Sequence, residues 1–130
     1  MRPDKLTIGL MEKNLLGYLR KKETNPCWEL ASISPETLKK RAEKIVKKLT
    51  DENVKAVALR SSFGGGSLPE YEYDSFGIKI TGKPSALSDK LRSFTTPVIP
   101  RSAASGVLID LRTVFPHQDS ILAEAIKTCL

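Results

Sequence analysis

Two stretches of the chain carry apolar side chains at helical spacing. Residues 4–21 form the first, and Asp4 suits the start of a helix there. Its apolar stripe consists of Ile8, Met11, Leu15 and Leu19, widened by Leu16. Residues 35–50 form the clearer helix, because Ser34 can cap it and Pro35 fits the first helical position. Its predicted buried face is Leu38, Ala42, Ile45, Val46 and Leu49, and its predicted outer surface is Lys39, Lys40, Arg41, Lys44, Lys47 and Lys48.

Alternation of apolar and polar residues predicts strands in the second half of the chain. Residues 54–62 and 75–81 show it most clearly, and shorter strands are expected over 97–101 and 107–114. Ser85 can cap a helix between the two pairs of strands. A last helix should follow Pro116, with Ile121, Leu122, Ala125 and Ile126 facing inward.

The order of these elements predicts an α+β fold. Strands joined by short turns form hairpins, so we expect a small antiparallel sheet of about four strands with helices packed on one face. The N-terminal helix precedes this layer pair. Residues 22–33 separate the N-terminal helix from the sheet and its helices, and this irregular stretch could contain a short helix or strand.

Composition adds a basic charge to this picture. The 130 residues suit one compact domain, and the net charge of +6 favours anionic partners such as RNA or phosphate. No apolar run is long enough to span a membrane, and no signal peptide is visible. Cys27 and Cys129 are expected to be free thiols, at least partly buried. With His117 as the single histidine, zinc ligation by this chain alone is ruled out, and no metal site is expected.

Three consecutive glycines, Gly64, Gly65 and Gly66, interrupt the strands. A phosphate-binding P-loop needs a lysine and a hydroxyl residue after its glycines, but Ser67 is followed here by Leu68 and Pro69. Two interpretations remain for this segment. It is a slack hairpin loop, or it lines a ligand site where the missing Cβ atoms let the backbone approach a substrate.

Few side chains suggest catalysis by this chain alone. His117 and Asp119 lie two residues apart at a helix start, where Asp119 more naturally complements the helix dipole. Arginine suits bidentate contacts to carboxylate or phosphate, so Arg60, Arg101 and Arg112 are binding candidates. Taken singly, a surface or ion-paired role is favoured for each of them.

Several stretches occur together in an order that resembles one known family. They are "RPDK", "SPETLKKRAEKI", "GGGSLP", "PVI-R" and "IDLRTVFPHQD". Together they resemble the C-terminal part of the bacterial selenocysteine synthases, the pyridoxal-phosphate-dependent L-seryl-tRNA(Sec) selenium transferases. The likeness covers nearly the whole chain, and it rests on the order and spacing of the motifs.

The resemblance implies a fragment of a longer fold-type-I enzyme. Residues 1–33 would be a helix and connector from the large domain, residues 34–130 the small C-terminal domain, and Met1 a position inside a longer natural chain. The lysine that binds pyridoxal phosphate would lie upstream, so no bound cofactor, no catalytic residue and no activity are expected in this chain alone. An apolar patch should be exposed where the helix over 4–21 and Trp28 meet the missing large domain.

The resemblance also implies particular residues and partners. Arg2 would lie near the site of the selenium donor anion, selenophosphate. Gly64, Gly65, Gly66, Ser67, Arg101 and Arg112 would face the active site. The full-length enzyme would be a homo-oligomer acting on seryl-tRNA(Sec), and the lack of a visible signal peptide or membrane-length apolar run separately predicts a cytoplasmic location. Two alternatives remain open, a fragment of a related pyridoxal-phosphate-dependent lyase and a stand-alone basic module that binds RNA or protein.

Overall fold

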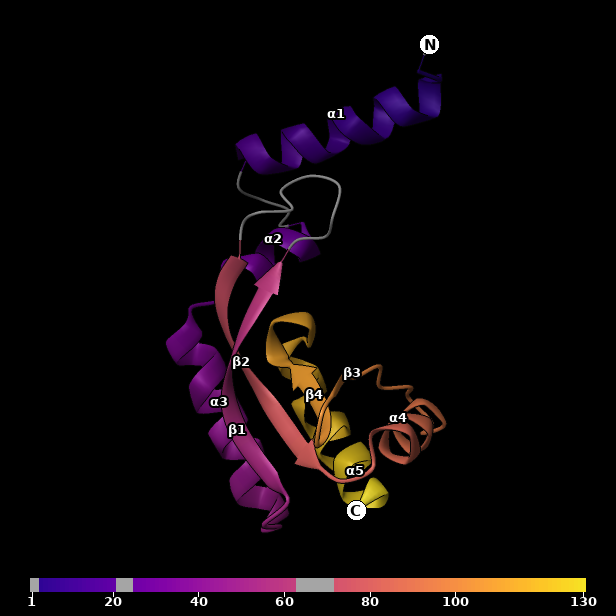
Figure 1. The fold of residues 1–130 in the computed structure, drawn as a ribbon. Helices are drawn as coiled ribbons and strands as arrows, with labels where there is room; N and C mark the ends of the chain where they lie inside the picture. Colours follow the sequence, from indigo (N-terminus) through magenta and orange to yellow (C-terminus); the bar gives the residue numbers. More distant parts are fainter. Residues whose placement is uncertain (1–2, 21–24, 63–71) are drawn as a thin grey trace. The chain divides into compact units, whose positions relative to one another are not determined.

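The structure is a computed structural model of the 130-residue chain, and it describes residues 3–20, 25–62 and 72–130 (Figure 1). The chain divides into two compact units. The first comprises Met1–Ser32 and the second Ile33–Leu130. Arg2, Gly64, Gly65, Gly66 and Ser67, which the resemblance points to, lie outside the described residues.

The described residues of the first unit form two helices. α1 spans Lys5–Arg20, and the Asp4 carboxylate caps its start by accepting hydrogen bonds from the Thr7 amide (2.9 Å) and hydroxyl (2.8 Å). The amide hydrogen bond is the main cause that lowers the pKa of Asp4. α2 spans Pro26–Ala31 and is capped by Asn25, so the stretch predicted as irregular contains a short helix.

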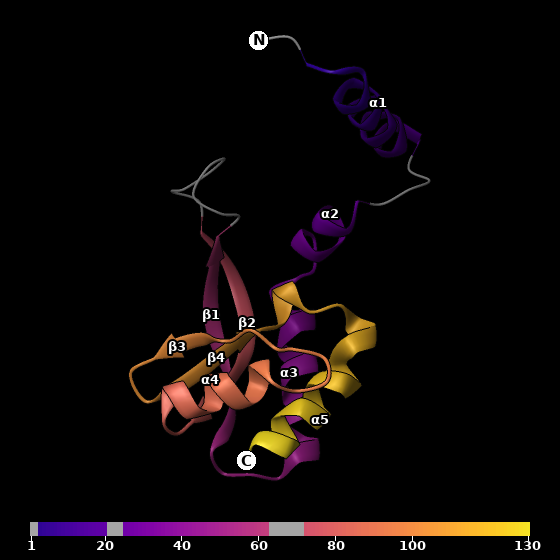
Figure 2. The same cartoon turned by 90° about the vertical axis from the view of Figure 1, so that its right-hand side faces the viewer.

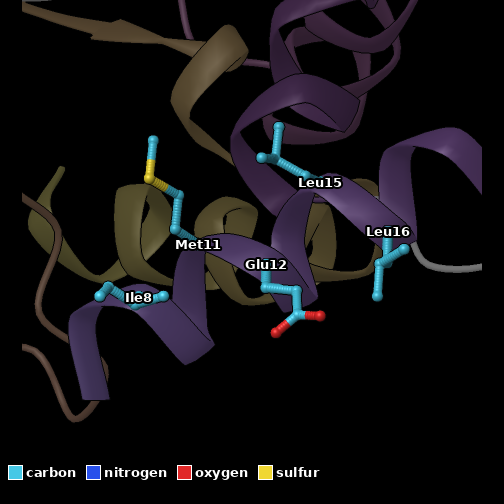
Figure 3. Close-up of a pocket in the computed structure, with 5 residues that line it drawn as sticks. All are labelled: Ile8, Met11, Glu12, Leu15 and Leu16. Atoms are coloured by element: carbon cyan, nitrogen blue, oxygen red, sulfur yellow. The ribbon is translucent and has the colours of Figure 1, made fainter. Parts of the chain in front are cut away.

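No side chain of α1 is buried, although most of its apolar residues were expected on one stripe. Leu6, Met11, Tyr18 and Leu19 are each at least 65% exposed, and Trp28 in α2 is 66% exposed. A shallow pocket on α1 is lined by Ile8, Met11, Glu12, Leu15 and Leu16, all from successive turns of this one helix (Figure 3). The apolar surface expected on this segment is therefore present.

The second unit begins with α3 (Pro35–Leu49), which starts and faces inward as the sequence predicts. The Ser34 hydroxyl accepts a hydrogen bond from the Thr37 amide (3.2 Å), and Pro35 occupies the first helical position. Leu38, Ala42 and Ile45 are buried, and Val46 and Leu49 pack against the core. Thr50 ends the helix in the left-handed conformation, with φ of 49°.

The described residues after α3 form one antiparallel sheet, in the strand order β1-β2-β4-β3 (Figures 1 and 2). Its strands are β1 (Val54–Ser62), β2 (Glu72–Thr81), β3 (Arg101–Ala103) and β4 (Gly106–Asp110). β4 pairs only with residues 77–81 of β2. The ends of β1 and β2 that lead to residues 63–71 therefore project past β4 as a two-stranded arm, which both views show.

The helices of this unit cover one face of the sheet. α3, α4 (Pro84–Arg92) and α5 (Asp119–Cys129) supply Leu38, Ala42, Leu91, Leu122 and Ile126 to a core that includes Val54, Ile78, Ile80, Val107 and Ile109 from the strands. Because side chains alternate along a strand, the residues between these core positions point to the other side. In the described part of the unit no helix packs on that second side, which we call the open face. The predicted α+β fold with helices on one face is confirmed.

Several boundaries differ from the prediction for physical reasons. The strand expected over 97–101 lies instead at Arg101–Ala103, because Pro97 and Pro100 have no backbone N–H to donate to a neighbouring strand. The strand expected over 107–114 ends at Asp110, whose carboxylate accepts the Arg112 amide (3.0 Å) and caps the 3-10 turn Leu111–Thr113. α4 begins at Pro84, so Ser85 lies inside the helix rather than capping it.

Three side chains lie in different environments from those expected. Arg41 was expected on the solvated face of its helix, but its guanidinium is largely buried. It contacts both Asp119 oxygens (2.6 and 3.0 Å) and donates to the Val114 carbonyl (2.8 Å). Ile121 is 37% exposed rather than inward-facing. Cys27 is exposed, whereas Cys129 is buried, and both are free thiols.

Candidate functional site

Arg112 lies inside the second unit and bonds to backbone oxygens. Its guanidinium donates to the carbonyl of Ile33 (2.9 Å), just before α3, and to the carbonyl of Asp74 (2.7 Å) in β2. The side chain is 6% exposed. These contacts tie the segment before α3 to the sheet, so the structure gives Arg112 a structural role. Its expected role facing the active site stays a prediction.

Arg101 lies on the open face, where it meets a cluster of polar side chains. Its Nη1 donates to the backbone carbonyl of Arg60 (3.3 Å), and its Nη2 lies 3.9 Å from the Asp110 carboxylate. The Arg101 side chain thus reaches from β3, at one edge of the sheet, to β1 at the other. It stays 54% exposed, so much of the guanidinium remains accessible to a ligand.

Asp110 is the centre of this cluster. Its carboxylate accepts hydrogen bonds from the hydroxyls of Ser61 and Ser75 (2.6 Å for Ser75), in addition to the Arg112 amide. The Asp110 side chain is 10% exposed and Ser75 is 1% exposed. Four residues, Ser61, Ser75, Arg101 and Asp110, therefore form a fixed polar group that we call the open-face cluster.

Sequence reasoning found Arg101 but not the other three members of this cluster. Ser61, Ser75 and Asp110 come from three different strands, and only the strand register brings them together. The sequence signal that could have identified these three residues is their type and their position within each strand. Each is a small polar or acidic residue inside an otherwise apolar or alternating strand, at a position of the alternation that the helices do not cover.

Arg60 is held by two carboxylates away from this cluster. It donates to Asp74 (2.6 Å) and Glu72 (3.1 Å), and the hydrogen bond to Asp74 is the main cause that raises the pKa of Arg60. All three side chains are exposed, so these ion pairs contribute little to stability. The surface ion-paired interpretation therefore describes Arg60.

The His117–Asp119 pair is not assembled for nucleophilic catalysis. Asp119 is engaged with Arg41, and the His117 ring stacks on Phe115 with centroids 5.5 Å apart. Among the described residues there is no group of three or more histidine, cysteine, aspartate or glutamate side chains that could hold a metal ion. In the same residues, no helix has the length and apolar character needed to cross a membrane.

The described lysines do not fit a pyridoxal-phosphate site. Lys79 is half-buried, and every other lysine in residues 3–20, 25–62 and 72–130 is exposed. A lysine that forms a Schiff base is normally desolvated in a pocket, which lowers the pKa of its amine. This part of the chain therefore offers no lysine environment of the required kind.

The fold and the open-face cluster describe an α+β domain with one uncovered sheet face and an accessible guanidinium on it. Comparison with known proteins places this domain. Residues 1–115 match the family described as L-seryl-tRNA selenium transferase. The chain belongs to the L-seryl-tRNA selenium transferase family, which confirms the resemblance seen in its motifs.

Individual relatives agree with this assignment. The L-seryl-tRNA(Sec) selenium transferase of Alkaliphilus oremlandii is 32% identical over 136 residues, covering 97% of this chain and 29% of that protein. The enzyme of the same name from Clostridium botulinum strain Hall is 29% identical over 140 residues, covering 100% and 30%. That from Aquifex aeolicus is 32% identical over 126 residues, covering 92% and 28%. The chain thus spans about 30% of the length of these relatives.

Proposed function

We propose that this chain is the C-terminal small domain of a pyridoxal-phosphate-dependent selenium transferase. The full-length protein would convert seryl-tRNA(Sec) to selenocysteinyl-tRNA(Sec) with selenophosphate as the donor. The observation that carries the proposal is the family match over residues 1–115, together with relatives of one name aligned over 92–100% of the chain. We place the full-length enzyme in the cytoplasm as a homo-oligomer.

Two features support the proposal that this domain packs on, and functions together with, another part of the full-length protein. α1 and α2 expose apolar side chains, including Met11, Leu19 and Trp28, that a stable enzyme normally covers. The lysines described in this chain do not suit cofactor binding, and the relatives are more than three times as long as the matched region. We therefore assign cofactor binding, through the Schiff-base lysine, to the part of the enzyme outside this chain.

Within the proposed enzyme, the residues of this chain bind and orient substrate. Arg2 would contact the anionic selenium donor. Gly64–Gly66 and Ser67 would line the cleft between the domains, and Arg101 would present its guanidinium toward a substrate anion. Arg112 would act indirectly, by holding the segment before α3 against the sheet. Pyridoxal phosphate supplies the electron sink of the reaction when it is bound.

The complete natural reading frame and the 130-residue chain should be compared in one assay. The full-length protein should bind pyridoxal phosphate and form selenocysteinyl-tRNA from seryl-tRNA(Sec) and selenophosphate, whereas the chain alone should do neither. Release of ammonia from a free amino acid, without the tRNA product, would identify a lyase instead. Product formation by the chain alone would overturn its assignment as an inactive domain.

The role of Arg2 has a test within the same enzyme. Arg2→Ala should raise the KM for selenophosphate and leave the affinity for tRNA unchanged, because the arginine contacts the donor only. Arg20→Ala is the matched control, since Arg20 is an exposed arginine at the C-terminal end of α1. An equal loss of donor use and tRNA affinity in Arg2→Ala would rule out the donor-specific role.

A further inference from the structure

The strand register places the backbone positions of three cationic residues in one row across the open face. Lys55 in β1 pairs with Lys79 in β2, Lys79 pairs with Leu108 in β4, and Leu108 pairs with Arg101 in β3. Residues directly opposite in neighbouring strands share a face, so all four side chains project from the open face. We call Lys55, Lys79 and Arg101 the cation row.

The charge balance of the open face is strongly positive. In the described strands, the acidic and basic residues at open-face positions are the three members of the cation row and Asp110. The direct Lys55–Lys79 pairing brings like charges together, which destabilises a sheet. An anionic partner on this face would relieve that repulsion.

Asp110 does not neutralise Arg101 completely. The 3.9 Å separation between Arg101 Nη2 and the Asp110 carboxylate is longer than a hydrogen bond, and three other donors already occupy that carboxylate. Arginine carries five N–H donors, and within the described residues the Arg60 carbonyl takes one of them. Asp110 and the Arg60 carbonyl thus orient a guanidinium that keeps donors for a ligand.

We propose that the open face binds the phosphate backbone of RNA through the cation row, and that Asp110 positions Arg101 for this contact. The strands lie about 4.8 Å apart, so the backbone positions from Lys55 to Arg101 extend over roughly 14 Å. The Arg101 guanidinium extends from its end of the row toward Asp110 and the Arg60 carbonyl. A row of this length suits successive phosphates along a strand better than one small anion. Half-buried Leu108 lies within the row and offers an apolar contact to sugar or base.

This inference depends on the proposed function only for its choice of tRNA as the probe. The open face can bind RNA whether or not the full-length protein transfers selenium, and the transferase assay above is scored separately. A failure of RNA binding by the open face therefore leaves the proposed activity standing. A failure of transferase activity leaves the RNA contact standing.

The cation row should be tested by the salt dependence of tRNA binding. The 130-residue chain is titrated into labelled, unacylated tRNA(Sec), and fluorescence anisotropy gives the Kd at several salt concentrations. The slope of log Kd against log salt concentration should fall by about one for each phosphate-contacting cation that a substitution removes. Lys55→Gln/Lys79→Gln should therefore reduce the slope by about two, and Arg101→Gln should reduce it by about one and raise Kd about tenfold at low salt.

A matched double variant on the opposite side of the domain is the control. Lys44→Gln/Lys48→Gln removes two exposed lysines from α3 and changes the net charge by the same amount. It should leave the slope close to that of the unmodified chain. If it weakens binding as much as Lys55→Gln/Lys79→Gln, the RNA contacts α3 or the total charge, and the open-face proposal is wrong.

The sign of one effect tests whether Asp110 positions Arg101. Simple electrostatics predicts that Asp110→Asn strengthens RNA binding, because a negative charge is removed from the face. Positioning predicts that Asp110→Asn weakens it, because Arg101 loses its orienting partner. Ser61→Ala/Ser75→Ala should weaken binding as well, without any change of charge, and far-UV circular dichroism confirms that both variants are folded. Tighter binding by Asp110→Asn would overturn the positioning role.

Inorganic phosphate separates an RNA site from a small-anion site. At constant ionic strength, millimolar phosphate should displace little tRNA, because one small anion does not engage the whole row. Efficient displacement, together with a chemical-shift change of the Arg101 Nε–H on adding phosphate alone, would identify a small-anion site. That result would overturn the assignment of this face to an RNA backbone.

Discussion

Removing the Arg112 guanidinium should destabilise the second unit strongly. Arg112→Met keeps a long apolar side chain but removes the donors to the carbonyls of Ile33 and Asp74 (2.9 and 2.7 Å). Hydrogen bonds from a charged donor contribute about 1.5–3 kcal/mol each, and burying the guanidinium offsets part of this. We expect the free energy of unfolding to fall by about 3 kcal/mol.

This loss is large enough to measure as a melting temperature. In a domain of this size, 1 kcal/mol corresponds to roughly 4–8 °C, so the melting temperature should fall by roughly 12–24 °C. Helix content followed by far-UV circular dichroism is the appropriate signal. The single tryptophan, Trp28, lies outside the unit that contains Arg112.

Two variants separate this structural role from the expected role at the active site. Arg101→Met removes an exposed guanidinium and should change stability by less than about 0.5 kcal/mol. Arg112→Lys keeps the charge but lacks the planar fork that reaches two carbonyls, so most of the loss should remain. If the free energy of unfolding of Arg112→Met lies within about 0.5 kcal/mol of that of the unmodified chain, Arg112 does not have the proposed structural role. Loss of transferase activity without loss of stability would then favour a substrate contact.

Three further predictions concern packing and charge in the second unit. Arg41→Met and Asp119→Asn should each lower the free energy of unfolding by about 2–4 kcal/mol, measured by urea unfolding. The double variant should lose at least about 1 kcal/mol less than the sum of the two single losses, and additive losses would exclude a coupled pair. A Cβ on Gly77 would lie 2.1 Å from a backbone oxygen of β4, so Gly77→Ala should cost about 3 kcal/mol or more. Gly9 lies in α1, and a Cβ added there would meet no atom within 4 Å, so Gly9→Ala should leave the stability of the second unit unchanged. Equal losses of stability in Gly77→Ala and Gly9→Ala would refute the close approach at Gly77. Burial raises the pKa of the Cys129 thiol above its ordinary value of about 9, so its contribution to stability is complete at neutral pH and is lost as the pH rises above about 9. The difference in stability between the unmodified chain and Cys129→Ala should therefore shrink from pH 7 to pH 10, and a constant difference would contradict this.

The elements with strong local signals could be predicted from the sequence. Ser34 and Pro35 mark the start of α3, and alternation in 54–62 and 75–81 identifies the longest strands, because caps and periodicity depend on neighbouring residues only. Position 41 shows the limit of this reasoning. Arg41 stands among lysines on an apparently solvated helix face, and its partner Asp119 lies 78 residues further along the chain. No local pattern identifies such a pair.

The same limit explains the candidate site. Arginine chemistry pointed to Arg101 and Arg112 together, but the structure separates them into an exposed guanidinium and a buried one. The supporting residues Ser61 and Ser75 become neighbours of Asp110 only through the register of three strands. A single sequence gives residue types on a strand, whereas pairing decides which of them meet.

The end of β4 shows how one local interaction decides this separation. In a strand continued to residue 114, Asp110 and Arg112 would share a face, because they lie two residues apart. The Asp110 carboxylate instead accepts the Arg112 amide and starts the turn Leu111–Thr113, which ends the alternation. The Arg112 side chain consequently reaches the carbonyls of Ile33 and Asp74, while Asp110 stays on the open face near Arg101. Asp110 therefore has two roles, as the cap that sends Arg112 inward and as the carboxylate that orients Arg101. Asp110→Asn, which keeps an oxygen to accept the amide, should preserve the first role and impair the second.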